Sequence, residues 1–451
     1  MYLLISITAL VVSFVLFKKV AGRLKLTQLN MISWLFFYSL IIQSFIASVL
    51  IVHNIDNQYM INKLNDENSR IYGWLAVQYT LIMMPLGMLF VVRLFGYKHN
   101  NRIFQKYVHS DIVPFLSIKD TYIRYPLYLL SFIAVLSVIY VMLMLKTIPI
   151  TGIIQGLSSE ALGLLRQSAS RGFPGNEYVK NILALGLTPI LAYISFSYYK
   201  MTKSKFDLIW FFILLIVTFL ILSYNIAKSP FIEFLLGLLF LNILINGSIK
   251  KKTLFIFFGS ALLMFVFLYF VISKVTDFSL LFSYNHGIGG RVLLTQAAGN
   301  YLSFDLFPNT VEHIGFSSMS GLLSSILDVT YVERSSRLLM ENYFHSRIVA
   351  GTGGVINSLF IAEAWANFGL VGVLIAPFYV GVVIQTLFMF FLTMPKTPLV
   401  LGLFALFSYK GGVMGGFNNY IYNPGFTILA LIFVLVYFTG LFFKQRKKNN
   451  D

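Results

Sequence analysis

Basic side chains between the apolar runs are the groups in this chain best suited to chemistry. Two long interruptions of the apolar pattern hold seven candidates, namely Arg166, Arg171, Arg291, Arg334, Arg337, His345 and Arg347. A guanidinium group presents a planar fork of N–H donors that binds two oxygens of one phosphate. Several arginines around one cavity would therefore bind a diphosphate. Lys228, in the short turn of YNIAKSPFIEF, would add a point charge.

Each of these cations also has an ordinary structural explanation. An arginine can pair with a nearby acid, or its aliphatic stem can lie along apolar surface while the charge reaches lipid headgroups. Arg171 directly precedes the breaker Gly172-Phe173-Pro174-Gly175, so we expect it at a helix C-terminus, where a cation is favoured. As a group, Arg166, Arg171, Arg291 and Arg347 have few acids close in sequence, which favours phosphate binding.

Two residues are candidates for a general base. Glu363 and Asn367 are four residues apart in an apolar stretch, so they are expected to share one helical face. A buried carboxylate there would act as a base or pair with an arginine, and both alternatives stay open. His345 and Arg347 are two residues apart, which would place them on the same side of an extended segment. His345 would serve as base or as a plain hydrogen-bonding residue.

Other kinds of chemistry are not favoured by the sequence. The chain has no Cys, which excludes disulfides, thiolate metal sites and cysteine nucleophiles. The six histidines lack metal-ligand spacing, so we expect neither a metal ion nor another cofactor. The net charge of +17 is distributed in short clusters between apolar runs rather than on one patch, so we expect no nucleic-acid partner.

The composition places the chain in a membrane. Of 451 residues, 58% are hydrophobic and only 11% are charged, and the mean hydropathy is +0.79. A soluble domain carries about 25% charged residues. We therefore predict an all-α, polytopic membrane protein, with residues 1–451 forming a single integral membrane domain.

Eleven segments are long and apolar enough to be predicted as membrane-spanning helices. They lie near residues 2–17, 29–53, 72–96, 125–145, 181–199, 206–225, 229–247, 253–273, 369–392, 398–413 and 425–443. The connections between them alternate in charge. One set contains about twenty Lys and Arg residues against four Asp, which predicts the cytoplasmic side. The N-terminus is then outside and the C-terminus cytoplasmic.

Two connections on the predicted outer side are much longer than a turn requires. They cover residues 146–180 and 274–368, and they contain most of the basic residues named above. The second is rich in Leu, Phe, Tyr and Ile, and residues 317–327 and 335–343 have helical patterns. We expect the functional site in these two loops.

This layout resembles the bacterial oligosaccharide repeat-unit polymerases, the Wzy group. The local likeness lies in GGVINSLFIAEAWANFGLVGVLIAPFYVGVVIQ, residues 353–385, where a Gly-rich turn leads into a helix with an "FG..G" pattern. The turn at Lys228 is similar to a short outer turn that carries Arg in relatives. The chain departs from the Arg-then-ten-residues-then-Gly pattern of some polymerases, because Glu177 and Leu302 stand where glycine would follow Arg166 and Arg291.

The resemblance implies a metal-independent glycosyltransferase with the GT-C-like membrane fold of enzymes that use lipid-linked sugars. Such enzymes work at the outer face of the bacterial cytoplasmic membrane. They transfer a growing glycan from undecaprenyl diphosphate onto a lipid-linked repeat unit, in O-antigen, capsule or exopolysaccharide synthesis. Implied partners are the undecaprenyl-diphosphate-linked oligosaccharide, membrane lipids, a chain-length regulator and a flippase.

Two other functions stay open at this stage. An O-antigen ligase shares the layout and the lipid-linked donor. A lipid-linked oligosaccharide flippase, or another transporter, would require charges distributed through the spans. The predicted spans have few charges, and these lie near span ends, at Arg93, Glu233 and Lys410. Transport is therefore the less favoured of the two.

Overall fold

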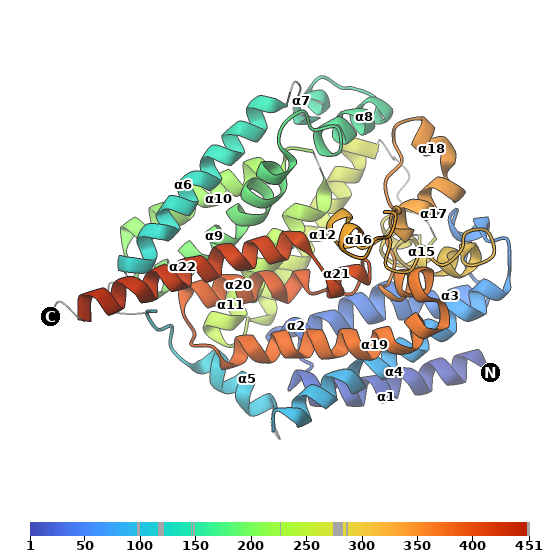
Figure 1. Ribbon diagram of the computed structural model, residues 1–451, viewed down its shortest axis with the longest axis horizontal. Helices are drawn as coiled ribbons and strands as arrows, with labels where there is room; N and C mark the ends of the chain where they lie inside the picture. Colours follow the sequence, from blue (N-terminus) through green and yellow to red (C-terminus); the bar gives the residue numbers. More distant parts are fainter. Residues whose placement is uncertain are drawn as a thin grey trace. The chain divides into compact units, whose positions relative to one another are not determined.

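The computed structural model is built from helices (Figure 1). It describes residues 1–96, 100–115, 121–145, 147, 149–225, 227–273, 283–285 and 287–448. In these ranges the only extended pairing is one isolated bridge between Leu359 and Met414. The chain divides into two compact units rather than showing one cluster of contacts. The first comprises residues 1–104, 275–390 and 411–422, and the second residues 105–274, 391–410 and 423–451.

The first unit contains the N-terminal helices and most of the long loop after residue 274. Its elements are α1 (Tyr2–Ala21), η1 (Leu26–Gln28), α2 (Met31–Trp34), η2 (Leu35–Phe45), α3 (Ile46–Val52), η3 (Ile61–Lys63), α4 (Asn68–Leu94), α14 (Gly287–Val292), α15 (Leu294–Leu306), α16 (Gly321–Ile326), α17 (Ser335–Tyr343), α18 (His345–Val349), α19 (Ile361–Thr393) and α21 (Asn418–Ile421). Helix α5 (Asn100–His109) is divided between the two units, and the last three residues of α19 belong to the second.

Glycines allow α4 and α19 to approach closely in the first unit. A Cβ atom at Gly87 of α4 would collide with the carbonyl of Phe378, and one at Gly381 of α19 would collide with the carbonyl of Met84. Small residues at such contacts are typical of helix packing in membranes, where close backbone approach replaces the hydrophobic driving force. In Figure 1, α1, α4 and α19 run alongside one another.

The second unit contains the remaining helices. These are α6 (Thr121–Met144), α7 (Pro149–Ile154), α8 (Ser159–Ser170), η4 (Val179–Leu187), α9 (Thr188–Thr202), α10 (Lys205–Leu222), α11 (Lys228–Asn246), α12 (Lys251–Ser273), α20 (Pro398–Lys410) and α22 (Pro424–Lys448). A buried ion pair joins α6 to α10. The Arg124 guanidinium donates to both oxygens of Asp207, at 3.0 and 3.3 Å, and lies over the ring of Tyr198 at 4.5 Å. Both charges are thus compensated inside the unit.

Nine of the eleven predicted spans coincide with helices that are long and apolar enough to cross a membrane. Within the described residues these are Tyr2–Gln28, Met31–Val52, Asn68–Leu94, Tyr122–Met144, Val179–Thr202, Lys205–Leu222, Ser229–Asn246, Ile361–Thr393 and Asn418–Phe442. The predicted span 398–413 is the shorter apolar helix α20. The span 253–273 lies in α12, where many side chains are outside the described part. The polytopic membrane class is confirmed.

The buried Lys396 of the second unit should make the stability of the folded protein depend on pH. Its ammonium group is buried and donates to the carbonyls of Val108 (2.9 Å), Ser110 (2.8 Å) and Ile245 (3.4 Å). Burial lowers the pKa of Lys396 to about 8, and the charge of Asp111 opposes this shift only in part. Because the unfolded chain keeps this proton up to about pH 10.5, it binds more protons than the folded chain between pH 8 and 10.5.

The stability of the wild type should therefore rise with pH across that window relative to the variant Lys396→Met. The measurement is the midpoint of thermal unfolding in detergent from pH 7 to 10.5. Lys250→Met, which removes an exposed lysine, is the matched control. A wild type and Lys396→Met that respond equally to pH would contradict the prediction.

Candidate functional site

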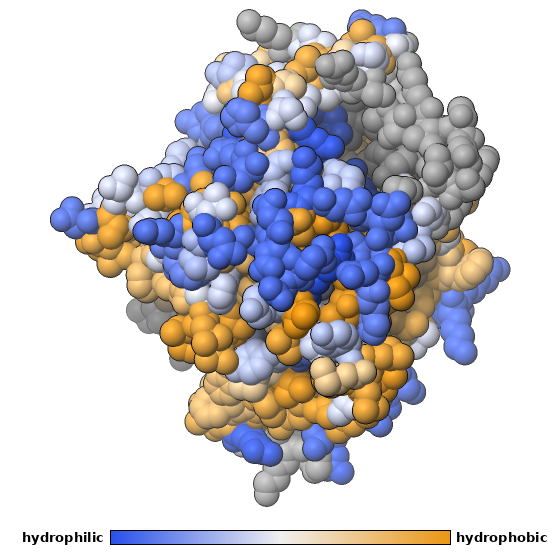
Figure 2. Space-filling view, turned by 90° about the vertical axis from the view of Figure 1, so that its right-hand side faces the viewer, coloured by the Kyte–Doolittle hydropathy of each residue, from blue (hydrophilic) through white to orange (hydrophobic). Residues whose placement is uncertain are grey.

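The loop cap, our term for residues 53–69, 283–285, 287–368 and 411–422, lies entirely in the first unit. It gathers most of three connections that the charge pattern places on one side of the membrane. Residues 53–69 tie its parts together, because the Tyr284 hydroxyl donates to the Ile55 carbonyl and the Asn57 amide donates to Asn285 Oδ1, both at 2.9 Å. Figure 2, which faces the side where α3, α15, α17 and α18 lie in Figure 1, shows hydrophilic residues gathered above a band of hydrophobic ones.

Asp305 is the main polar anchor inside the loop cap. It is 3% exposed, near the end of the buried helix α15. Its carboxylate accepts hydrogen bonds from the main-chain amides of Asn65 (3.1 Å) and Asp66 (2.7 Å), and from the Tyr343 hydroxyl (2.5 Å). Burial, together with the hydrogen bond to Asp305, raises the pKa of Tyr343. One carboxylate thereby joins residues 53–69 to α15 and α17.

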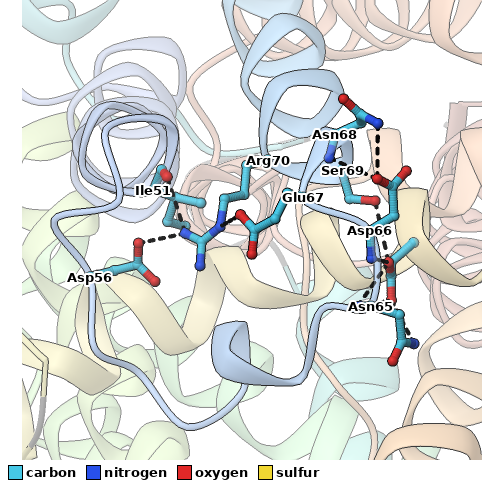
Figure 3. A network of polar contacts seen from close by, with 9 residues as sticks. Ile51, Asp56, Asn65, Asp66, Glu67, Asn68, Ser69 and Arg70 are labelled. Atoms are coloured by element: carbon cyan, nitrogen blue, oxygen red, sulfur yellow. Dashed lines mark hydrogen bonds and ion pairs between the residues drawn. The ribbon is translucent and has the colours of Figure 1, made fainter.

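Arg70, in the first turn of α4, closes the other end of residues 53–69 (Figure 3). Its guanidinium lies 2.7 Å from Asp56 Oδ1 and 2.8 Å from Glu67 Oε2, and it donates to the carbonyl of Ile51 at 3.1 Å. The side chain of Asp56 is completely buried. Arg70 therefore neutralises two acids of residues 53–69, Asp56 and Glu67.

Glu363 and Arg334 form a two-bond ion pair across the loop cap. Arg334 Nε lies 2.7 Å from Glu363 Oε1, and Nη2 lies 2.8 Å from Oε2. Glu363 is 1% exposed. Burial works to lower the pKa of Arg334, but the hydrogen bond and charge of Glu363 outweigh it and raise that pKa. Of the two roles left open for Glu363, the geometry provides the ion pair with an arginine.

Residues 411–422 complete this polar cluster. The Asn418 amide donates to Glu363 Oε2 at 2.8 Å, and Arg334 Nη1 donates to Asn419 Oδ1 at 3.0 Å. Asn367 Nδ2 donates to Asn418 Oδ1 at 2.8 Å, so Glu363 and Asn367 do share a helical face. Position 416 has room only for glycine, because a Cβ atom there would collide with both Arg334 and Glu363.

A kink at Gly369 separates the loop cap from the span that follows it. Gly369 has φ 57° and ψ −139° inside α19, a backbone conformation that side chains with a Cβ rarely adopt. Just before the kink, the carbonyls of Ala366 and Asn367 accept hydrogen bonds from amides outside the helix, those of Ile314 (3.1 Å) and Gly315 (2.9 Å). The predicted span begins at residue 369, and α19 indeed changes direction there. Its first eight residues, with Glu363, belong to the loop cap.

Arg291 and Arg347 are the two predicted phosphate ligands of the loop cap that remain exposed and have no acid partner among the described residues. Arg291 ends α14. The guanidinium of Arg347 lies over two aromatic rings, 5.2 Å from that of Tyr59 and 5.4 Å from that of Phe344. Their charge is available to an anionic ligand. Arg337 is engaged, because its Nε lies 2.8 Å from Glu341 Oε1.

Three predicted ligands belong to the second unit. Arg166 in α8 donates from Nε to the carbonyl of Asn225 at 3.2 Å. Arg171 is the exposed residue that follows the last residue of α8, so its predicted place at a helix C-terminus is confirmed. Lys228 begins α11, but its side chain lies outside the described part. Glu233 pairs with Lys410 at 2.5 Å.

The expectation that His345 and Arg347 lie on one side of an extended segment is wrong. Both belong to the short helix α18, in which residues two apart point in nearly opposite directions. Helix α17 ends before Phe344, whose φ of −134° is not helical. The carbonyl of Arg347 accepts hydrogen bonds from the amides of Thr352 and Gly353. His345 itself is exposed.

The connection 53–69 was not among the predicted parts of the site. Its residues Tyr59 and Lys63 lie beside Phe344, and Asn65 and Asp66 bind Asp305. The connection is short and holds one lysine against three acids, so neither its length nor a group of basic residues singled it out. Its dense run of Asn, Asp and Gln between two apolar segments was the available signal.

Comparison with known proteins gives no relative for this chain. No family model, no curated protein and no solved structure matches it.

Proposed function

We propose that this protein is a membrane glycosyltransferase that polymerises oligosaccharide repeat units carried on undecaprenyl diphosphate. The acceptor hydroxyl oxygen attacks the anomeric carbon of the growing glycan, and the bond from that carbon to the diphosphate oxygen breaks. The hydroxyl proton passes to a base, and the lipid diphosphate leaves with the bonding electrons. Cations that stabilise the charge developing on the diphosphate lower the barrier.

The observation that carries the proposal is the pair Arg291 and Arg347. Both are exposed, and neither has a carboxylate partner among the described residues of the loop cap. The first unit, to which both arginines belong, also contains apolar helices long enough to span a membrane, and such helices can accommodate a polyprenyl chain. An oxyanion attached to a membrane lipid fits this combination of guanidinium charge and apolar surface. Arg171, which belongs to the second unit, stays a prediction from the sequence.

The proton acceptor in this proposal is His345 rather than Glu363. Both oxygens of Glu363 already accept hydrogen bonds from Arg334 or Asn418, so its role here is to position Arg334 and residues 411–422. His345 is exposed in the same short helix as Arg347. Imidazole is a common general base in enzymes and can accept a hydroxyl proton.

The test is the length distribution of surface glycan in cells. Deletion of the gene should leave glycan with one repeat unit, and complementation should restore long polymer. Lipid-linked long polymer would instead indicate a ligase, units trapped inside would indicate a flippase, and an unchanged distribution would refute a role in this pathway.

Arg291→Ala and Arg347→Ala should each lower the polymerisation rate about 100-fold, since removing one oxyanion donor has an effect of that size. Lys250→Ala is the control for expression and charge. Normal polymer from both well-expressed arginine variants would exclude the proposed diphosphate site.

A further inference from the structure

Two cations from different segments of the loop cap share one aromatic ring. Lys63 Nζ lies 5.6 Å from the ring centroid of Phe344, and the Arg347 guanidinium lies 5.4 Å from the same centroid. The ring of Tyr59 makes a T-shaped contact with Phe344, with centroids 5.9 Å apart, and the Arg347 guanidinium lies 5.2 Å from the Tyr59 ring centroid. We call Tyr59, Lys63, Phe344 and Arg347 the cation–aromatic cluster.

Local hydrogen bonds hold both cations where they are. Lys63 ends the short helix η3, and the side chain of Gln58 fixes the start of that helix by accepting from the amides of Met60 (2.7 Å) and Ile61 (3.3 Å). The carbonyl of Arg347 accepts from the amides of Thr352 (2.9 Å) and Gly353 (2.6 Å). The site is therefore largely formed before a ligand arrives, which lowers the entropy cost of binding.

The acids nearest in sequence do not neutralise this cluster. Asp56 and Glu67 pair with Arg70, and Asp66 accepts from Asn68 at 2.9 Å. Across the ranges that the structure covers, neither Lys63 nor Arg347 forms an ion pair. Two like charges held near one ring repel each other, and an anion placed with them removes that repulsion.

We propose that the cation–aromatic cluster binds a sugar that bears an oxyanion, either a carboxylate or a phosphate. The oxyanion contacts Lys63 and Arg347, and the pyranose ring packs on Tyr59, which is 44% exposed. The exposed amide side chains of Asn57 and Asn62, hydrogen-bonded to each other at 3.0 Å, offer partners for sugar hydroxyls. The choice of a sugar rests on the proposed function.

Saturation-transfer NMR on the full-length protein in detergent tests this directly, because it detects weak carbohydrate binding. The probes are a hexasaccharide that alternates glucuronate with N-acetylglucosamine, the neutral N-acetylglucosamine hexasaccharide, N-acetylglucosamine 1-phosphate and inorganic phosphate. The variants are Lys63→Met, Arg347→Met and Tyr59→Leu. Lys63→Arg should retain binding, and Lys250→Met is the control for a lost surface charge.

We expect an anionic sugar to bind the wild type and the neutral hexasaccharide to bind at least 10-fold more weakly. Lys63→Met and Arg347→Met should each weaken anionic-sugar binding about 10-fold, the effect of one lost charged hydrogen bond. Preference for the glucuronate hexasaccharide would identify an acidic repeat unit. Preference for the sugar phosphate would indicate that the cluster binds the sugar at the end of the glycan that is attached to the lipid carrier.

Several results would overturn the inference. Equal binding of acidic and neutral hexasaccharides would mean that the cations play no part. Inorganic phosphate binding as tightly as the sugar phosphate would mean that no sugar is recognised. Binding of vesicles with anionic lipid alone, lost in Lys63→Met, would assign the cluster to headgroups. Normal polymer and unchanged sugar binding in Lys63→Met would refute this inference while leaving the proposed polymerase intact.

Discussion

Replacing Arg334 with Met should lower the free energy of unfolding by about 3–5 kcal/mol, because it leaves a carboxylate uncompensated in the protein interior. Glu363 is 1% exposed and loses two of its three hydrogen-bond donors in this variant. The remaining donor is a single main-chain amide, which cannot stabilise the charge alone. Thermal and denaturant unfolding in detergent, followed by tryptophan fluorescence, measure the loss.

Two comparisons make the result for Arg334 specific. Arg337→Met removes a more exposed pair within one helix, with Glu341, and should cost at most about 1 kcal/mol. The double variant Arg334→Met/Glu363→Met removes both charges and should recover much of the stability, since apolar replacement of a buried pair is often tolerated. Equal losses in Arg334→Met and Arg337→Met would show that Glu363 is not held as described.

Asp305→Ala should be the second most damaging substitution, with a loss of about 3 kcal/mol. The carboxylate is the shared acceptor for two main-chain amides and a tyrosine hydroxyl, and its removal leaves buried donors without a partner. Residues 53–69 should then detach from α15. Faster amide hydrogen exchange at Asn65 and Asp66 would report this local opening.

Tyr343→Phe is the matched control for Asp305. It removes one of the donors and leaves the two main-chain hydrogen bonds of the carboxylate in place, so it should cost about 1 kcal/mol. A loss in Tyr343→Phe as large as that in Asp305→Ala would assign the effect to Tyr343 packing instead of to the carboxylate.

The membrane fold was predictable because its signal is local and strong. Apolar runs of about 20 residues satisfy the length that a bilayer requires, whatever their neighbours are. Helix α17 and the end of α8 at Arg171 were predictable for the same reason, from pattern and breakers within one segment. The π-helical stretches Leu35–Phe45 and Val179–Leu187 were not, since nothing in their hydrophobic pattern separates them from an α-helix.

The candidate site was only partly predictable, because its contacts join distant segments. Spacing placed Asn367 beside Glu363, but the partner of Glu363 lies 29 residues away in another element, and the sequence left two roles open. Asp305 gave no sign of its role, since two of its donors are main-chain amides, those of Asn65 and Asp66, which any residue but proline provides. The extended geometry expected at His345 was wrong because residues 345–349 form a short helix, and the carbonyl of Arg347 in that helix accepts from the amides of Thr352 and Gly353.

The contact between Glu363 and Asn418 has a consequence for how the chain matures. These residues are 55 positions apart, and the rest of α19 and all of α20 are made between them. At about 5–20 residues per second, Asn418 leaves the ribosome several seconds after Glu363. A nascent chain thus exposes an incomplete polar cluster until two further helices are inserted. Chains that stall before residue 411 would present that unfinished surface to chaperones and proteases, which can then distinguish them from finished copies.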